Sequence, residues 1–101
     1  MGLATEGSLE TILIVEDDTV IRRVVHNILE QAGFGLLVAA NGIEALKIES
    51  GFEATIGLLL SDIMMPDISG PDLAKKLKEL RPQMRVMLMS GYPDGATLVL
   101  N

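Results

Sequence analysis

The sequence contains no cysteine, and it is poor in positive charge. Without cysteine the chain can form neither a disulfide framework nor a thiolate metal site, which agrees with a reducing cytoplasm. Eight Lys and Arg stand against fourteen Asp and Glu, so the net charge is −6. This balance argues against a domain that binds nucleic acid through a basic face.

Long apolar runs are also absent. None approaches the ~20 residues that a membrane span requires, and residues 1–10 lack the basic and apolar regions of a secretory signal. We therefore expect a cytoplasmic protein that does not enter a membrane. The length of 101 residues, with 49% hydrophobic and 22% charged residues, indicates one folded domain. We assign residues 11–101 to this domain and regard residues 1–10 as a frayed tail or a cloning remnant.

Apolar patterns predict four strands that alternate with three helices. The strands are expected at residues 11–15, 34–40, 54–61 and 85–90, and the helices at residues 19–32, 43–50 and 71–80. Such an alternation with short connections predicts a parallel sheet with right-handed crossovers and helices on both faces. The last residues, 96–101, fit the start of a helix or a strand equally well.

Polar residues stand where three of these strands end. Glu16 and Asp17 follow the first strand, Asp62 follows the third, and Ser90 ends the fourth. Because the carboxyl ends of parallel strands meet at one edge of a sheet, we expect these side chains to lie close together. Three carboxylates there would repel one another, at about 1 kcal/mol per pair in water and more where water is excluded. Either a shared proton or a bound cation must compensate.

An all-oxygen site favours a hard ion such as Mg²⁺, which is suited to phosphoryl chemistry. A carboxylate of the cluster could then act as a nucleophile and form an aspartyl phosphate. For Asp62 alone, a charge that simply terminates a strand is the alternative. Outside the cluster we interpret Asp18 as a helix cap and Asp67 as a solvated loop residue, and Arg22 and Arg23 as a solvated helix face or, alternatively, a docking surface.

Three segments resemble the receiver domains of two-component response regulators. They are Ile-Leu-Ile-Val-Glu-Asp-Asp at residues 12–18, Leu-Ser-Asp-Ile-Met-Met-Pro at residues 60–66 with Gly70 following, and Val-Met-Leu-Met-Ser-Gly-Tyr at residues 86–92. The resemblance implies an α/β, flavodoxin-like, doubly wound parallel sheet with strand order 2-1-3-4. On this resemblance we expect the fifth strand and last helix of the family to be missing.

The resemblance also implies the roles of the clustered residues. Asp62 would accept a phosphoryl group from a histidine kinase or a phosphotransfer protein, and Ser90 would be the switch hydroxyl. Mg²⁺ would be held by Glu16, Asp17, Asp62 and the backbone carbonyl of Met64. The domain would be a signalling receiver and not a turnover enzyme.

The sequence departs from the family pattern after residue 92. Family members carry a Lys at the end of the fifth strand, whereas the four lysines here lie in predicted helices. Those lysines are Lys47, Lys75, Lys76 and Lys78. In the family the side chains at Met64 and Tyr92 tune the phosphoryl lifetime. The missing elements should leave the face beside the helix at residues 19–32 uncovered and the fourth strand as an open edge, so we expect completion by another chain or a homodimer through that face or edge.

Two further interpretations belong to different functional classes. In one, the fragment has lost its switching ability and acts only as a protein-docking or dimerisation module. In the other, the chain is a Mg²⁺-dependent phosphohydrolase with an Asp nucleophile. The haloacid-dehalogenase-like form of that enzyme needs a second Asp two residues after the nucleophile, where this chain has Met64.

Overall fold

The structure is a computed structural model that describes residues 10–90 and 98–100. Its elements follow the predicted alternation of strands and helices. They are β1 (Thr11–Val15), α2 (Thr19–Gln31), β2 (Gly35–Ala39), α3 (Gly42–Gly51), β3 (Leu58–Asp62), α4 (Gly70–Leu80), β4 (Arg85–Met89) and β5 (Leu98–Leu100). Within the described residues, no helix combines the length and apolar character needed to cross a membrane.

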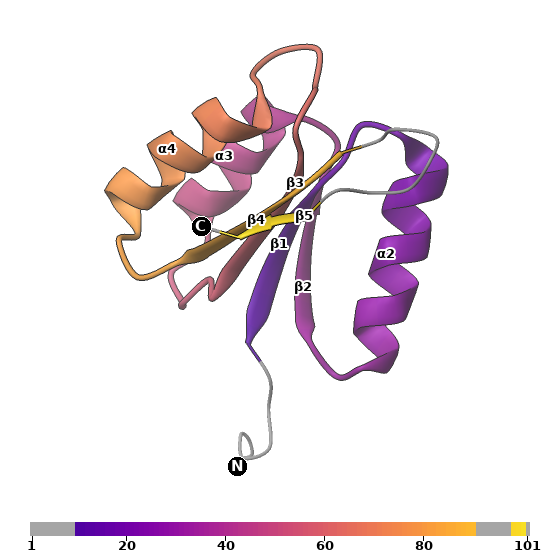
Figure 1. Ribbon diagram of the computed structural model, residues 1–101. Helices are drawn as coiled ribbons and strands as arrows, with labels where there is room; N and C mark the ends of the chain where they lie inside the picture. The colour runs from indigo at the N-terminus through magenta and orange to yellow at the C-terminus, as the bar shows by residue number, and fades with distance from the viewer. Residues whose placement is uncertain (1–9, 91–97, 101) are drawn as a thin grey trace.

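The strands form one sheet in the order β2-β1-β3-β4-β5. The first four are parallel, which confirms the predicted order 2-1-3-4 and the flavodoxin-like fold. In Figure 1, α3 and α4 cover one face of this sheet and α2 lies against the other. All four parallel strands therefore direct their carboxyl ends to the same edge.

The central strand β1 contributes side chains to the core on both faces of the sheet, because successive side chains point to opposite sides. Leu13 and Val15 join the larger buried cluster, beneath α3 and α4, whereas Ile12 and Ile14 join a smaller cluster beneath α2. All four side chains are at most 2% exposed. The continuous apolar run of β1 is thus explained by burial on both sides.

Helix α2 is bounded by the residues that its sequence predicts. Asp18 is the N-cap, with Oδ1 accepting hydrogen bonds from the amides of Val20 (2.9 Å) and Ile21 (3.0 Å). Gly33 follows the C-cap with a φ of 100°, a conformation that glycine adopts without strain. The cap assignment of Asp18 is confirmed.

One side of α2 is open to solvent. Val20, Val24 and Ile28, which succeed one another at four-residue intervals, are 71%, 50% and 62% exposed. The inner residues of the helix, Val25 and Leu29, pack only partly buried on the smaller cluster. These exposures belong to the helix itself, so the uncovered face beside it stays a prediction.

The third strand begins later than predicted, at Leu58 instead of residue 54. The reason is a set of hydrogen bonds from Arg81, whose guanidinium binds the carbonyls of Phe52 and Ala54 and the carboxylate of Glu49. These bonds hold the preceding segment as a loop outside the sheet. The second strand is also shorter, at Gly35–Ala39 instead of residues 34–40.

The prediction that β4 forms an open edge is wrong at its carboxyl end. There β5 runs antiparallel to β4 and pairs residues 87–89 with residues 100–98. Of the two possibilities for the last residues, a strand is the one observed. It runs opposite to a parallel fifth strand, so the parallel part of the sheet keeps four strands. The tail at residues 1–9 and Tyr92 lie outside the described residues.

Candidate functional site

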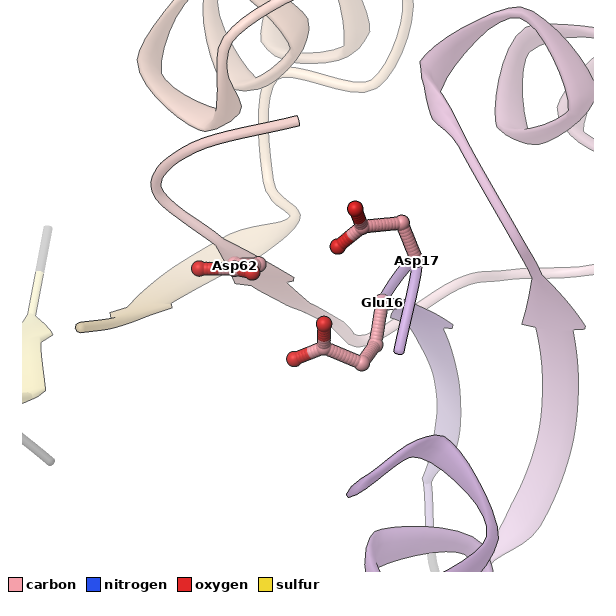
Figure 2. A group of neighbouring side chains, drawn as sticks. All are labelled: Glu16, Asp17 and Asp62. Atoms are coloured by element: carbon pink, nitrogen blue, oxygen red, sulfur yellow. The ribbon is translucent and has the colours of Figure 1, made fainter. Parts of the chain in front are cut away.

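Three carboxylates meet at the carboxyl edge of the sheet. Glu16 and Asp17 follow β1, and Asp62 is the last residue of the neighbouring strand β3. Each contributes an oxygen to a set whose members all lie within 4.8 Å of one another. Figure 2 shows the Glu16 and Asp17 side chains extending from the end of β1 toward the side on which Asp62 lies. The strand-edge argument from the sequence therefore identified a real cluster.

Glu16 is the buried member of the cluster, with only 3% of its surface exposed. Its amide donates to the Ala39 carbonyl (3.2 Å), and its Oε2 accepts from the Asp18 amide (3.0 Å). Burial, followed by the neighbouring charge of Asp62 and the side-chain contacts with Asp17 and Asp62, raises the pKa of Glu16 to about 7. The hydrogen bond from Asp18 opposes this shift and is too weak to cancel it.

Asp62 is half-buried and opens the loop that leads to α4. The Met64 amide lies 3.4 Å from Asp62 Oδ1, at the long end of hydrogen bonding, and the Met64 side chain is 75% exposed. The loop closes on itself, because the Gly70 amide donates to the Ile63 carbonyl at 2.8 Å. A Cβ atom at Gly70 would collide with the Asp62 carbonyl, so this close return requires glycine.

Ser90 directly follows β4 at the same edge and is 7% exposed. Its strand is bonded to the strand of Asp62, since the Ile63 amide donates to the Met89 carbonyl at 2.9 Å. In the register of the two strands, Asp62 lies opposite Met89. The structure thus places Ser90 one residue beyond the level of Asp62, on the neighbouring strand.

Asp67 makes hydrogen bonds to another element that the sequence interpretation missed. It is an exposed loop residue, as the sequence predicts, but it also accepts hydrogen bonds from the amides of Ile43 (2.8 Å) and Gly42 (3.2 Å), at the start of α3. The Ile43 bond, aided by those from Gly42 and Ile68, lowers the pKa of Asp67. Its carboxylate therefore ties the loop after Asp62 to α3. Two consecutive unpaired amides after Asn41 were the only sequence signal for such a partner.

Arg22 was misinterpreted as part of a solvated helix face. Its Nη1 donates to the main-chain carbonyl of Glu16 at 2.7 Å, so the guanidinium is fastened to the acidic cluster. The neighbouring Arg23 is exposed, in agreement with the sequence interpretation. A signal was available, because an arginine near a helix N-terminus opposes the helix dipole and calls for a compensating partner.

The cluster fits a hard divalent cation. Its donors are carboxylate oxygens alone, which suits Mg²⁺ better than a thiophilic or imidazole-preferring metal. Burial is the main cause of the raised pKa of Glu16, and the neighbouring carboxylates of Asp62 and Asp17 add to it; a bound cation would offset this second, smaller contribution. Chemically, the site can hold a cation between two strand ends beside a partly exposed carboxylate.

A doubly wound α/β domain with an acidic cluster at the carboxyl edge of its sheet belongs to the flavodoxin-like class, whose ligands bind at this edge. The profile of the response regulator receiver domain matches residues 12–99, and the chain belongs to this family. It is thus a signalling module of two-component systems, not a turnover enzyme.

The chain covers very different shares of its curated relatives. The chain is 36% identical over 93 residues to the response regulator receiver protein CpdR of Brucella abortus, covering 92% of the chain and 73% of CpdR. It is 33% identical over 86 residues to the sensor kinase CckA of the same organism, covering 85% of the chain and 9% of the kinase. The chain therefore spans only a small part of the kinase's length.

Solved structures of relatives share the fold. The response regulator TrrA of Thermotoga maritima, crystallised with Mg²⁺ and BeF, superposes with a TM-score of 0.73 at 32% identity, covering 85% of this chain and 73% of TrrA. A further match belongs to the structure of the histidine kinase ThkA in complex with TrrA, with a TM-score of 0.71, 32% identity and coverages of 83% and 71%.

Proposed function

We propose that this domain accepts a phosphoryl group on Asp62 in the presence of Mg²⁺. The observation that carries the proposal is the set of three carboxylate oxygens within 4.8 Å, contributed by Glu16, Asp17 and Asp62. Asp17 and Asp62 are both accessible to a donor, whereas Glu16 is buried. Of the two, Asp62 stands at the position that the resemblance to receiver domains assigns to the acceptor. The proposed phosphoacceptor is accordingly Asp62, and Glu16 and Asp17 serve the cation.

The transfer requires one bond to form and one to break. A carboxylate oxygen of Asp62 attacks the phosphorus of a phosphohistidine, and the new O–P bond replaces the N–P bond. The bonding electron pair leaves with the imidazole nitrogen, which takes up a proton from solvent. When bound, Mg²⁺ would supply positive charge against the phosphoryl oxygens.

The other residues of the site hold the participants in place. Glu16, Asp17, Asp62 and the backbone carbonyl of Met64 would bind the cation. Ser90, directly after the strand next to that of Asp62, would donate a hydrogen bond from its hydroxyl to a phosphoryl oxygen. Support for this arrangement comes from the relative TrrA, which was crystallised with Mg²⁺ and BeF.

The proposed donor is a histidine kinase or a histidine phosphotransfer protein. The relative TrrA was crystallised in complex with the histidine kinase ThkA. Since a phosphohistidine must approach Asp62 from solvent, the exposed Met64 side chain beside it lies at the entrance and is expected to contact the donor.

The test is phosphorylation by a small phosphodonor in Mg²⁺, measured by intact mass. Wild-type protein should gain the mass of one phosphoryl group, whereas Asp62→Asn should gain none. Asp72→Asn is the matched control, because it makes the same chemical change at an exposed position of α4, outside the acidic cluster, and should still be phosphorylated. An adduct that persists in Asp62→Asn would refute the assignment.

One observation favours a second function, that of a docking module without phosphoryl transfer. All four lysines of the sequence lie in α3 and α4, so none stands at the carboxyl ends of the strands as in the family pattern. In this case wild-type protein would gain no phosphoryl mass from either a small donor or a phosphorylated kinase, while still binding the kinase in a titration.

A further inference from the structure

Arg22 stands out among the cations of the chain. All eight Lys and Arg lie within the described residues, and Arg22 is the one whose side chain is hydrogen-bonded to a residue of the acidic cluster. It is the fourth residue of α2, where a positive charge is unfavourable because of the helix dipole. Its contact with Glu16 is therefore the feature that needs explanation.

The hydrogen bond fixes the backbone between two cluster residues. The Glu16 carbonyl, which accepts from Arg22 Nη1 at 2.7 Å, belongs to the peptide unit that joins Glu16 to Asp17. A peptide unit is planar, so fixing its carbonyl oxygen also fixes the orientation of the bond that leads to the Asp17 Cα atom. The direction in which the Asp17 side chain leaves the backbone follows from this.

The segment between β1 and α2 makes further hydrogen bonds, which involve Asp18 and Ala39. Ala39 accepts from the Glu16 amide, the Asp18 amide donates to the Glu16 carboxylate, and the Asp18 carbonyl accepts from the Arg22 amide at 2.9 Å. Arg22 closes this ring of hydrogen bonds between the end of β1 and the start of α2. Asp17 is exposed at its centre.

We propose that Arg22 is a positioning residue for the cation site. By holding the Glu16 carbonyl, it orients the Glu16 and Asp17 carboxylates toward Asp62, so that all three can share one cation. The inference rests on the proposed function, because it assumes that this cluster binds Mg²⁺.

The sign of the effect on Mg²⁺ affinity separates positioning from simple charge. A nearby guanidinium repels a cation, so removal of its charge alone should tighten Mg²⁺ binding slightly. Loss of positioning should weaken it, by about tenfold or more, as is usual for residues that orient metal ligands. The two explanations thus predict opposite changes.

The experiment compares Arg22→Gln with Arg23→Gln by calorimetric titration with MgCl₂. Both variants lose one positive charge from adjacent positions of α2, but Arg23 is exposed. Arg23→Gln should bind Mg²⁺ as the wild type does, or up to about twofold more tightly. Arg22→Gln should bind about tenfold more weakly, and its phosphorylation rate should recover at saturating Mg²⁺. Arg22→Lys, which keeps one donor, should lie between them.

A measurement in metal-free protein tests the hydrogen bonds between the end of β1 and the start of α2. In EDTA, hydrogen exchange at the Asp18 amide should accelerate in Arg22→Gln and stay unchanged in Arg23→Gln, because that amide is bonded to the Glu16 carboxylate. If Arg22→Gln does not fold, the comparison is made with Arg22→Lys.

Equal or tighter Mg²⁺ binding by Arg22→Gln relative to Arg23→Gln would overturn the inference, and so would an unchanged Asp18 exchange rate. The proposed function fails separately, when wild-type protein gains no phosphoryl group. Wild-type protein that binds no Mg²⁺ refutes both.

Discussion

A glutamate that is buried beside two other carboxylates makes the stability of the domain depend on pH. The pKa of Glu16 is raised from the ordinary 4.5 to about 7, first by burial and then by the charge of Asp62. Between these two pH values the folded protein binds more protons than the unfolded chain, so stability falls as pH rises. Above the pKa of Glu16 in the folded protein, the loss in free energy of unfolding is complete, on the order of 3 kcal/mol in metal-free protein.

Replacement of Glu16 by glutamine should remove this dependence, because glutamine carries no charge at any of these pH values. In EDTA we expect Glu16→Gln to exceed the wild type in free energy of unfolding at pH 8, and by much less at pH 5. Urea denaturation followed by circular dichroism measures both. Glu30→Gln, an exposed change on α2, should have little effect at either pH. A wild-type stability that stays level between pH 5 and pH 8 would contradict the explanation.

At the scale of elements, Arg81 holds the junction between α3, α4 and β3. Its Nε lies 3.0 Å from the Glu49 carboxylate, and its Nη1 donates to the Ala54 carbonyl at 2.7 Å. The Arg81 and Glu49 side chains are only 18% and 12% exposed. Loss of the guanidinium would leave a nearly buried carboxylate and several carbonyls without their donor.

Arg81→Met should therefore lower the free energy of unfolding by about 2–4 kcal/mol. The matched control is Arg85→Met, which removes an exposed arginine at the start of β4 and should cost less than about 0.5 kcal/mol. Urea midpoints report both changes. Because Arg81 lies at the opposite edge of the sheet from Asp62, Mg²⁺ affinity should be unchanged. Equal midpoints for the two variants would argue against the role of this junction.

Which features the sequence predicts depends on whether their cause is local. The strand β1 matches its prediction because burial on both faces leaves a continuous apolar run, and α4 matches within one residue because Pro71 marks its start. The start of β3 was placed too early because distant Arg81 holds the preceding loop. The hydrogen bonds of Asp67 and Arg22 were missed for the same reason, since their partners lie in other elements. The acidic cluster was predictable from the topology of parallel strands, whereas the hydrogen bonds that orient it were not.

At the scale of the whole molecule, the two faces of the sheet differ in how completely helices bury them. The face beneath α3 and α4 holds the larger cluster, whereas the other face is covered by α2, no residue of which is buried. The exposed side chains of Val20, Val24 and Ile28 form a continuous apolar stripe on this side. The homodimer expected from the sequence stays a prediction, and this stripe is where we place it, rather than at the paired edge of β4.

Ile28→Lys should weaken self-association, measured by sedimentation over a range of protein concentrations. Leu80→Lys is the matched control, since Leu80 is 60% exposed and Ile28 is 62% exposed, and both variants gain one positive charge. The two residues lie on opposite sides of the sheet, on α4 and α2 (Figure 1). A wild-type protein that stays monomeric at high concentration, or equal dissociation by both variants, would exclude this interface.

The hydrogen bond from the Ile63 amide to the Met89 carbonyl joins the residue after Asp62 to the residue before Ser90. Any movement of these two strand ends toward or away from each other must therefore change the length of this hydrogen bond. The chain has no tryptophan whose fluorescence could follow such an event. The Ile63 amide proton is instead a built-in spectroscopic reporter, and its exchange rate measures how often the two strand ends separate.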